Sequence, residues 1–500
     1  MKKIVVLVLG LVFALQMAAQ HVLDSKKPYL VTDFNERELE SVLEVCQKGG
    51  FEYLLVRTPF STFGHYQWNP EFAANDKAVA RMVQKAEAVG VYVGIMIQPE
   101  AISENDPYFT PKYSKHFLRE GKVELFSDIT AEDYDLALRR TDAIQGISSL
   151  NLILVENELI SYGTIEVAGD LLLLHHCTRG AYGTRKTPHT TQAEAYKIWD
   201  SPKRYVAPDE YLIDSVRMNL RRRITATGIS FVLQEGDPGQ ELLDGSVRVR
   251  QAERWAGKDG VSLGWINLHA ADKKRSATAI EDVEWILSKA VGFDAGYGLL
   301  IDRKAIKEHG QLDEILETIR LWEELRALDK LDKEQLEALR DPYQDWHLQQ
   351  DGEQIKLMRR NISRRYPCNF VEADSLFLGA EPWEWKAEAE GSFGLRLQVD
   401  GKVAVKNPMV NTEKGLVMFT CTIKPGQRLV YDSGTVAYVM DANYKKLAEI
   451  AVEGVAELPE GTSEVRFYCE TEKEGNRPVV TVRYFTSSQM GSFGSENHHK

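Results

Sequence analysis

Residues 79–98 read VARMVQKAEAVGVYVGIMIQ: a one-sided helical pattern runs into Gly90, and a short apolar strand follows. Glycine just past a helix adopts the left-handed backbone conformation without a Cβ penalty, so the chain can turn back as a buried strand. The same unit recurs at Gly50, Gly228, Gly260 and Gly292. Its repetition predicts parallel strands joined by helices.

Six strands are predicted in this part of the chain: Tyr29–Asp33, Tyr53–Val56, Tyr92–Ile97, Ser230–Leu233, Val261–Leu268 and Gly296–Ile301. The intervening helices carry apolar residues on one side, as expected for an outer layer packed on a sheet. We therefore predict an α/β fold of the TIM-type (β/α) barrel class. A seventh and an eighth strand are not evident, so an open, doubly wound sheet is the alternative.

With 500 residues the chain is too long for a single core, and several domains are expected. The barrel is assigned to residues 21–340. Within it, residues 107–200 break the helix–strand rhythm and are interpreted as a β-rich insertion after the third strand. Residues 345–490 alternate as strands and predict a C-terminal β-sandwich. Residues 491–500 are predicted to be a disordered tail.

The first 20 residues have the composition of a secretory signal peptide. Two lysines precede an apolar run, Ile4–Leu15, and small residues follow it. We therefore expect a secreted or periplasmic protein without an integral membrane segment. The net charge of −13 argues against a nucleic-acid partner. The five cysteines are interpreted as thiols, with pairing of Cys421 and Cys469 as the alternative, and none has zinc-ligand spacing.

Polar side chains gather where the predicted strands end, which is where the chemistry of parallel α/β folds lies. The loop after the second strand carries Arg57, His65 and Trp68, and the third strand ends in Gln98 and Glu100. Aromatic rings stack on the apolar faces of sugars, while Arg, His and amide groups hydrogen-bond sugar hydroxyls. We therefore expect these residues to line a sugar-binding subsite. Glu100 has two alternative roles, as a general acid or base or as a loop carboxylate that pairs with a neighbouring cation.

Carboxylates follow the later strands. Glu235 and Asp237 lie in the turn after the fourth strand, His269 and Asp272 follow the fifth, and Asp302 follows the sixth. Glycoside hydrolysis uses two carboxyl groups on either side of the scissile bond. Glu235 is the first choice for nucleophile or base, with Asp237 as the fallback. Asp272 and Asp302 are both candidates for the proton donor, and His269 is expected to bind a hydroxyl group.

A turn-rich motif, Arg179–Thr184, precedes His189 inside the predicted insertion. Its glycines supply backbone conformations that other residues resist, so a structural role is predicted.

Three segments resemble secreted bacterial α/β-barrel glycoside hydrolases related to the α-galactosidase-like clan: Phe63-Gly64-His65-Tyr66, Ala88–Gly94 and Tyr211–Glu241. In the third segment Glu235-Gly236 stands where those proteins have Asp-Gly, and the turn before Glu241 is longer. The resemblance covers residues 29–330 loosely. It implies a glycan-active barrel and no particular substrate.

We therefore expect a glycoside hydrolase that acts on a poly- or oligosaccharide and uses no cofactor and no metal. A non-catalytic glycan-binding protein on a degenerate glycosidase barrel is the alternative, and the departure from Asp-Gly at Glu235 favours it. A polysaccharide lyase would need a basic groove, against which the acidic composition counts.

Overall fold

A computed structural model describes residues 23–236, 239–243, 254–255, 260, 262–374, 376–387, 390–473 and 475–494. The chain divides into two compact units. Unit 1 consists of Met1–Leu23, Asp33–Val42 and Tyr53–Asp237, and unit 2 of Asp24–Thr32, Leu43–Glu52 and Pro238–Lys500. The strands predicted for one barrel are thus distributed over both units.

The parallel strands of unit 1 lie in the order β14-β3-β2. Strands β2 (Tyr53–Val56) and β3 (Tyr92–Ile97) have the predicted bounds, and β14 (Phe231–Gln234) begins one residue later than predicted. Helices α3 (Asp76–Glu87) and α4 (Ile213–Thr227) pack against each other. Gly94 makes the pairing of β3 with β14 possible, because a Cβ there would lie 2.3 Å from the Phe231 ring.

The segment between β3 and α4 forms small antiparallel sheets around a core of its own. It contains two short 3₁₀ helices, η1 (Ser114–His116) and η2 (Ala181–Gly183). Its strands are β4 (Ile102–Ser103), β5 (Arg119–Val123), β6 (Leu136–Arg139), β7 (Leu152–Val155), β8 (Glu158–Ser161), β9 (Thr164–Ala168), β10 (Leu171–His175), β11 (Ala195–Ile198), β12 (Asp200–Ser201) and β13 (Tyr205–Val206). The order is β5-β11-β7-β8 in one sheet, β6-β10-β9 in another and β12-β13-β4 in a third.

The parallel strands of unit 2 lie in the order β1-β17-β16-β15. They are β1 (Tyr29–Thr32), β15 (Leu242–Leu243), β16 (Trp265–Leu268) and β17 (Gly298–Ile301). The indole of Trp265 packs over Gly298 and donates a hydrogen bond of 2.8 Å to the hydroxyl of Tyr29. Trp265 is therefore a core residue.

The helices assigned to unit 2 are α6 (Ile280–Gly292), α7 (Arg303–Glu308), α8 (Leu312–Leu328) and α9 (Lys333–Arg340), whereas α2 (Leu39–Gly49) belongs to both units. Gly50, Gly90, Gly228 and Gly260 have the predicted positive φ angles, between 69° and 78°. Gly292 does not: it is the last residue of α6, and the left-handed conformation falls on Asp294, with φ of 48°.

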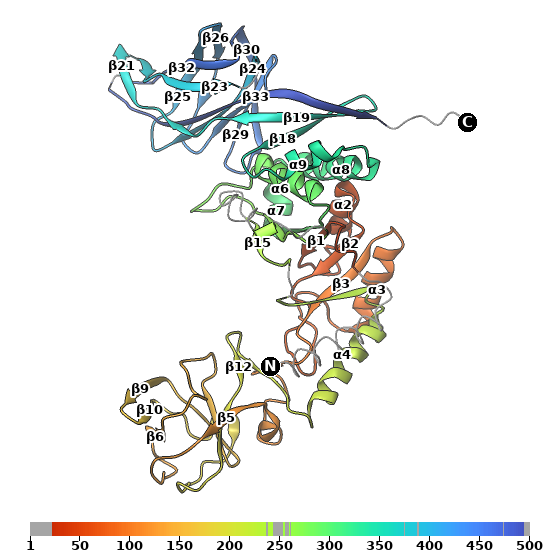
Figure 1. Cartoon of the computed structure of the whole chain (residues 1–500), viewed down its shortest axis with the longest axis vertical. Coiled ribbons are helices and arrows are strands. Elements are labelled where there is room, and N and C mark those ends of the chain that lie inside the picture. Colours follow the sequence, from red (N-terminus) through yellow and green to blue (C-terminus); the bar gives the residue numbers. More distant parts are fainter. Residues whose placement is uncertain are drawn as a thin grey trace, which may run out of the picture. The chain divides into compact units, whose positions relative to one another are not determined.

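Residues 345–494 form a large antiparallel sheet around a single apolar core. Its strands β18, β19 and β33 lie side by side, and β18 packs against α6 and α8 (Figure 1). The strands are β18 (Asp345–Asp351), β19 (Gln354–Ile362), β20 (Tyr366–Pro367), β21 (Phe370–Asp374), β22 (Phe377–Ala380), β23 (Trp383–Ala387), β24 (Gly391–Asp400), β25 (Val405–Thr412), β26 (Gly415–Phe419), β27 (Thr422–Ile423), β28 (Arg428–Tyr431), β29 (Val436–Met440), β30 (Lys446–Val455), β31 (Glu457–Leu458), β32 (Gly461–Glu470) and β33 (Val479–Gly494).

Barrel closure and the C-terminal tail remain to be compared with the sequence predictions. Among the described residues, no strand pairing closes the parallel strands into a ring, so a closed barrel stays a prediction. Residues 491–494, assigned to a disordered tail, continue β33, because they pair with β19. The predicted signal peptide, residues 1–20, and the end of the tail lie outside the described residues.

Candidate functional site

Glu235 and Gln98 meet at the carboxyl ends of two neighbouring parallel strands. Gln234 of β14 pairs with Ile97 of β3, so the residues that follow them are brought together. The backbone N–H of Glu235 donates to the Ile97 carbonyl oxygen at 2.9 Å. The Gln98 side-chain amide donates to Oε2 of Glu235 at 2.7 Å. This pair agrees with the strand-end rule used for the sequence and is the centre of the candidate site.

Lys203 supplies a cation to the same carboxylate, through an ion pair between its Nζ and Oε1 of Glu235. It lies in the turn between β12 and β13, and β13 pairs with β4, which follows β3 in the chain. The insertion therefore contributes directly to the site. The side chain of Glu235 keeps 27% of its surface exposed, so a ligand can reach it.

A second ion pair supports the Lys203 turn. Arg204, with a left-handed φ of 60°, makes two hydrogen bonds of 2.7 Å to the carboxylate of Glu104. Tyr182, from the turn-rich motif of the insertion, donates to the same carboxylate at 3.3 Å. The hydrogen bonds from Arg204 hold the pKa of Glu104 below its usual value. A non-glycine residue with positive φ is strained and persists only where its surroundings hold it, as these contacts hold Arg204. Such residues are frequent at functional sites.

The loop after β2 approaches Gln98 through a buried tyrosine. Tyr66 is fully buried, has φ of 51°, and directs its hydroxyl to the carbonyl oxygens of Gln98 and Pro99 at 2.7 and 2.9 Å. Burial raises the pKa of Tyr66 well above its usual value, so its hydroxyl remains a donor. The Phe63-Gly64-His65-Tyr66 motif thus helps to position the backbone that carries Gln98.

His65 is held by the buried carboxylate of Asp106. Its Nδ1 and its backbone N–H both contact this carboxylate at 2.8 Å, and its ring lies 4.1 Å from that of Tyr108. The side chain of Asp106 is fully buried, whereas that of His65 is 36% exposed. His65 therefore presents a fixed and accessible ring edge, which suits the hydroxyl-binding role predicted for it.

Three other residues predicted to bind sugar have structural partners. Glu100 forms an ion pair with Arg217 at 2.6 Å, and Arg57 lies 3.8 Å from Asp33. Trp68 is only 7% exposed, stacks on Phe60 and donates its indole N–H to Asp76 at 2.6 Å. Trp68 is therefore a packed residue of this loop, without the open ring face that a sugar platform needs.

The candidate residues of unit 2 are also engaged. The backbone of His269 bonds to Thr278, and its Nδ1 lies 3.1 Å from the carbonyl oxygen of Ala270. Asp272 accepts backbone hydrogen bonds from Lys274 and Arg275 and pairs with the Arg275 side chain at 3.0 Å. The Lys274 N–H and the Arg275 guanidinium lower the pKa of Asp272 to about 2.

Asp302 is the N-cap of α7, where its Oδ1 accepts a 2.7 Å hydrogen bond from the backbone of Ala305. An Asp at this position stabilises a helix by satisfying a free N–H group. A carboxyl group that donates a proton in glycoside hydrolysis needs a raised pKa, so the contacts of Asp272 do not suit this role. Asp237 lies outside the described residues.

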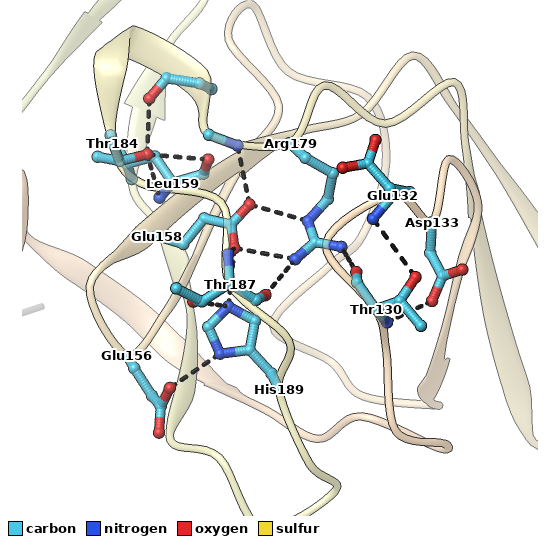
Figure 2. Close-up of polar contacts among 12 residues, drawn as sticks. Thr130, Glu132, Asp133, Glu156, Glu158, Leu159, Arg179, Thr184, Thr187 and His189 are labelled. Carbon is cyan, nitrogen blue, oxygen red and sulfur yellow. Dashed lines mark hydrogen bonds and ion pairs between the residues drawn. The ribbon is translucent and has the colours of Figure 1, made fainter.

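The turn-rich motif of the insertion forms a buried ion-pair cluster, shown in Figure 2. The Arg179 guanidinium makes two hydrogen bonds, of 2.8 and 2.9 Å, to Glu158, and the ring of His189 lies between Glu156 and Glu158 at 2.8 Å from each. Burial opposes ionisation of Glu158, but the hydrogen bonds from Arg179 and His189 hold its pKa below its usual value. The side chains of Glu158, Arg179 and His189 are at most 3% exposed, so the cluster has a structural role, as predicted.

Each carboxylate discussed at this end of unit 1 has a basic partner: Glu235 has Lys203, Glu100 has Arg217, Glu104 has Arg204 and Asp106 has His65. Lys203, Arg217, Glu104 and Asp106 were not singled out from the sequence. The two members of each pair lie between 32 and 117 residues apart in the chain. No local sequence pattern indicates pairings over such distances. Such a set binds hydroxyl groups well, because it offers both donors and acceptors.

In the part of the chain that the structure describes, no helix has the length and apolar character needed to cross a membrane. Over the same residues, no group of three or more His, Cys, Asp or Glu side chains is arranged to hold a metal ion. All five cysteines are free thiols, and burial raises the pKa of Cys46 to about 12.

No family model and no curated protein matches this chain. Solved structures similar to it include glycoside hydrolases. A variant of the GH36 α-galactosidase AgaA from Geobacillus stearothermophilus, in complex with stachyose, is 9% identical and has a TM-score of 0.32, over 92% of this chain and 58% of that one. The maltogenic α-amylase AmyB from Thermotoga neapolitana is 9% identical, with a TM-score of 0.34, over 94% of this chain and 100% of that one.

An α-amylase from Lactobacillus plantarum is 12% identical, with a TM-score of 0.28, over 76% of this chain and 93% of that one. The chain thus spans less than two thirds of the length of the α-galactosidase.

Proposed function

We propose that this protein is a glycoside hydrolase that acts on a poly- or oligosaccharide, with Glu235 as nucleophile or base. The observation that carries the proposal is the convergence of Glu235 and Gln98 at the carboxyl ends of β14 and β3. An ammonium at one oxygen and an amide N–H at the other suit an ionised carboxylate. We further propose that residues 1–20 are a secretory leader and that the activity lies in the periplasm or outside the cell.

In this account, Oε2 of Glu235 stays fixed by Gln98 while Oε1 faces the sugar. Lys203 is 60% exposed on a flexible stem, so it can leave Oε1 and hydrogen-bond a neighbouring hydroxyl when substrate arrives. His65 supplies a further hydrogen-bonding group, oriented by Asp106. Asp272 and Asp302 are not retained as proton donors, since both serve as local structural acceptors.

The second candidate function is glycan binding without hydrolysis. A glycosidase also needs a protonated carboxyl group. Glu235, Glu100 and Glu104 each have a basic partner, which favours the ionised form of a carboxyl group, and this observation favours glycan binding. The two functions differ in one readout. A hydrolase releases reducing sugar from members of a panel of plant and host glycans, whereas a binding protein retains the same glycans intact.

The panel is therefore assayed in parallel for reducing-sugar release and for retention of the protein on immobilised glycan. Release supports the hydrolase. Retention without release supports the binding protein and refutes hydrolysis. The absence of both refutes a carbohydrate function.

A further inference from the structure

A cavity of about 450 Å³ lies in unit 2 between the C-terminal sheet and helices α6 and α8. Ligand sites usually enclose about 300–1,000 Å³, so a small molecule fits. Its lining includes Glu284 of α6, His347 and Gln349 of β18, Arg360 of β19 and Gln311 beside α8. None of these residues belongs to the site around Glu235, and none was singled out from the sequence.

Two residues of this lining each have a buried polar atom that lacks a hydrogen-bond partner within the described part of the chain: Oε1 of Gln311 and Nε of Arg360. Gln311 is 6% exposed and Arg360 is 7% exposed. An unsatisfied buried donor or acceptor destabilises the folded state, so such atoms are rare and each calls for an explanation. Here one atom is an acceptor and the other a donor, and the two residues that carry them line the same cavity.

The ionic groups of the lining are balanced. They form the pairs Glu284 with His347 at 3.0 Å and with Arg360 at 3.5 Å, Asp432 with Arg396 at 2.6 Å, and Glu314 with Lys446 at 2.9 Å. A charged ligand would compete with these pairs for its partners. The lining therefore favours a neutral ligand that both donates and accepts hydrogen bonds.

Neutral sugars have this chemistry, since every hydroxyl group is one donor and an acceptor. We propose that the cavity is a second carbohydrate site, which binds one neutral sugar unit. One hydroxyl donates to Gln311 and another accepts from Arg360. Gln349 and Ser433 are exposed at the rim, so the site opens to solvent. The choice of ligand class rests on the proposed function, whereas the site is independent of Glu235.

The test is calorimetric titration of the full chain carrying Glu235→Gln, which prevents turnover, with neutral mono- and disaccharides and with a uronic acid. Gln349→Trp places a large ring at the cavity rim. Gln350→Trp is its matched control, because Gln350 is equally exposed on β18 but does not line the cavity. Gln311→Leu removes the buried acceptor at similar volume.

We expect a neutral sugar to bind, Gln349→Trp to abolish one binding event, and Gln350→Trp to leave it unchanged. Gln311→Leu should weaken it about tenfold, the loss of one hydrogen bond. Neutral-sugar binding that neither Gln349→Trp nor Gln311→Leu reduces overturns the proposal, as does a preference for the uronic acid. Sugar release by the wild-type chain is measured separately. The proposed hydrolase function can therefore fail while the cavity still binds sugar, and the cavity can fail to bind sugar while the chain still releases it.

Discussion

The side-chain amide of Gln98 donates a 2.7 Å hydrogen bond to the carboxylate of Glu235, 137 residues away in the chain. The two residues follow paired positions of β3 and β14, so the register of the parallel strands sets their separation. This bond fixes one carboxylate oxygen and leaves the other for Lys203 or a ligand. It is the contact on which the proposed chemistry depends.

Replacing Gln98 by Met should lower kcat/KM for sugar release by about 10- to 100-fold, since a hydrogen bond to a charged group contributes about 1.5–3 kcal/mol. Gln67→Met is the control, because Gln67 is an exposed residue of the loop after β2. In the presence of Glu235→Gln, the Gln98 change should have no further effect, as expected for two residues in direct contact. Full activity of Gln98→Met would show that this contact is not used.

Replacing Asp272 by Asn should leave sugar release unchanged, because its carboxyl group serves a local turn. The pKa of Asp272 is lowered to about 2 from its usual 3.8. The ionised form therefore stabilises the folded state above pH 4, and this contribution is lost as the pH falls from about 4 to 2. Melting temperatures of the two proteins should differ slightly at pH 7 and converge as the pH falls through about 2. A large loss of activity would restore Asp272 as a catalytic candidate.

Replacing Arg179 by Met should destabilise the insertion by about 3–5 kcal/mol, because it leaves the fully buried carboxylate of Glu158 without its main partner. Arg139→Met, which removes an exposed pair with Glu124, should cost about 1 kcal/mol or less. Hydrogen exchange in β8 measures both. The double variant Arg179→Met/Glu158→Gln should recover part of the lost protection. Equal protection in Arg179→Met and Arg139→Met would contradict a structural role for the cluster.

Much of the local structure follows from the sequence. Strands β2 and β3 were predicted residue by residue, because an apolar run after a glycine has few alternatives to a buried strand. The meeting of Gln98 with Glu235 follows from the same rule, since both stand where parallel strands end. The N-cap role of Asp302 could have been predicted from the sequence, because an Asp immediately before a short helical stretch is a typical N-cap.

Other features depend on packing and are not visible in a linear pattern. Trp68 looked like a sugar platform, but it stacks on Phe60 inside the loop. Lys203 reaches Glu235 only because β13 pairs with β4, a contact that bridges about a hundred residues. The left-handed conformation predicted at Gly292 falls two residues later, on Asp294, since α6 continues through the glycine.

The most direct measurement compares sugar release by the wild-type protein and by Glu235→Gln, with glycan retention and melting temperature recorded on the same samples. The side chains are nearly isosteric, and Gln98 can turn its amide to keep a hydrogen bond. The account predicts that Glu235→Gln loses sugar release by about a thousandfold or more while glycan retention and melting temperature stay within error. Wild-type rates in Glu235→Gln would contradict it.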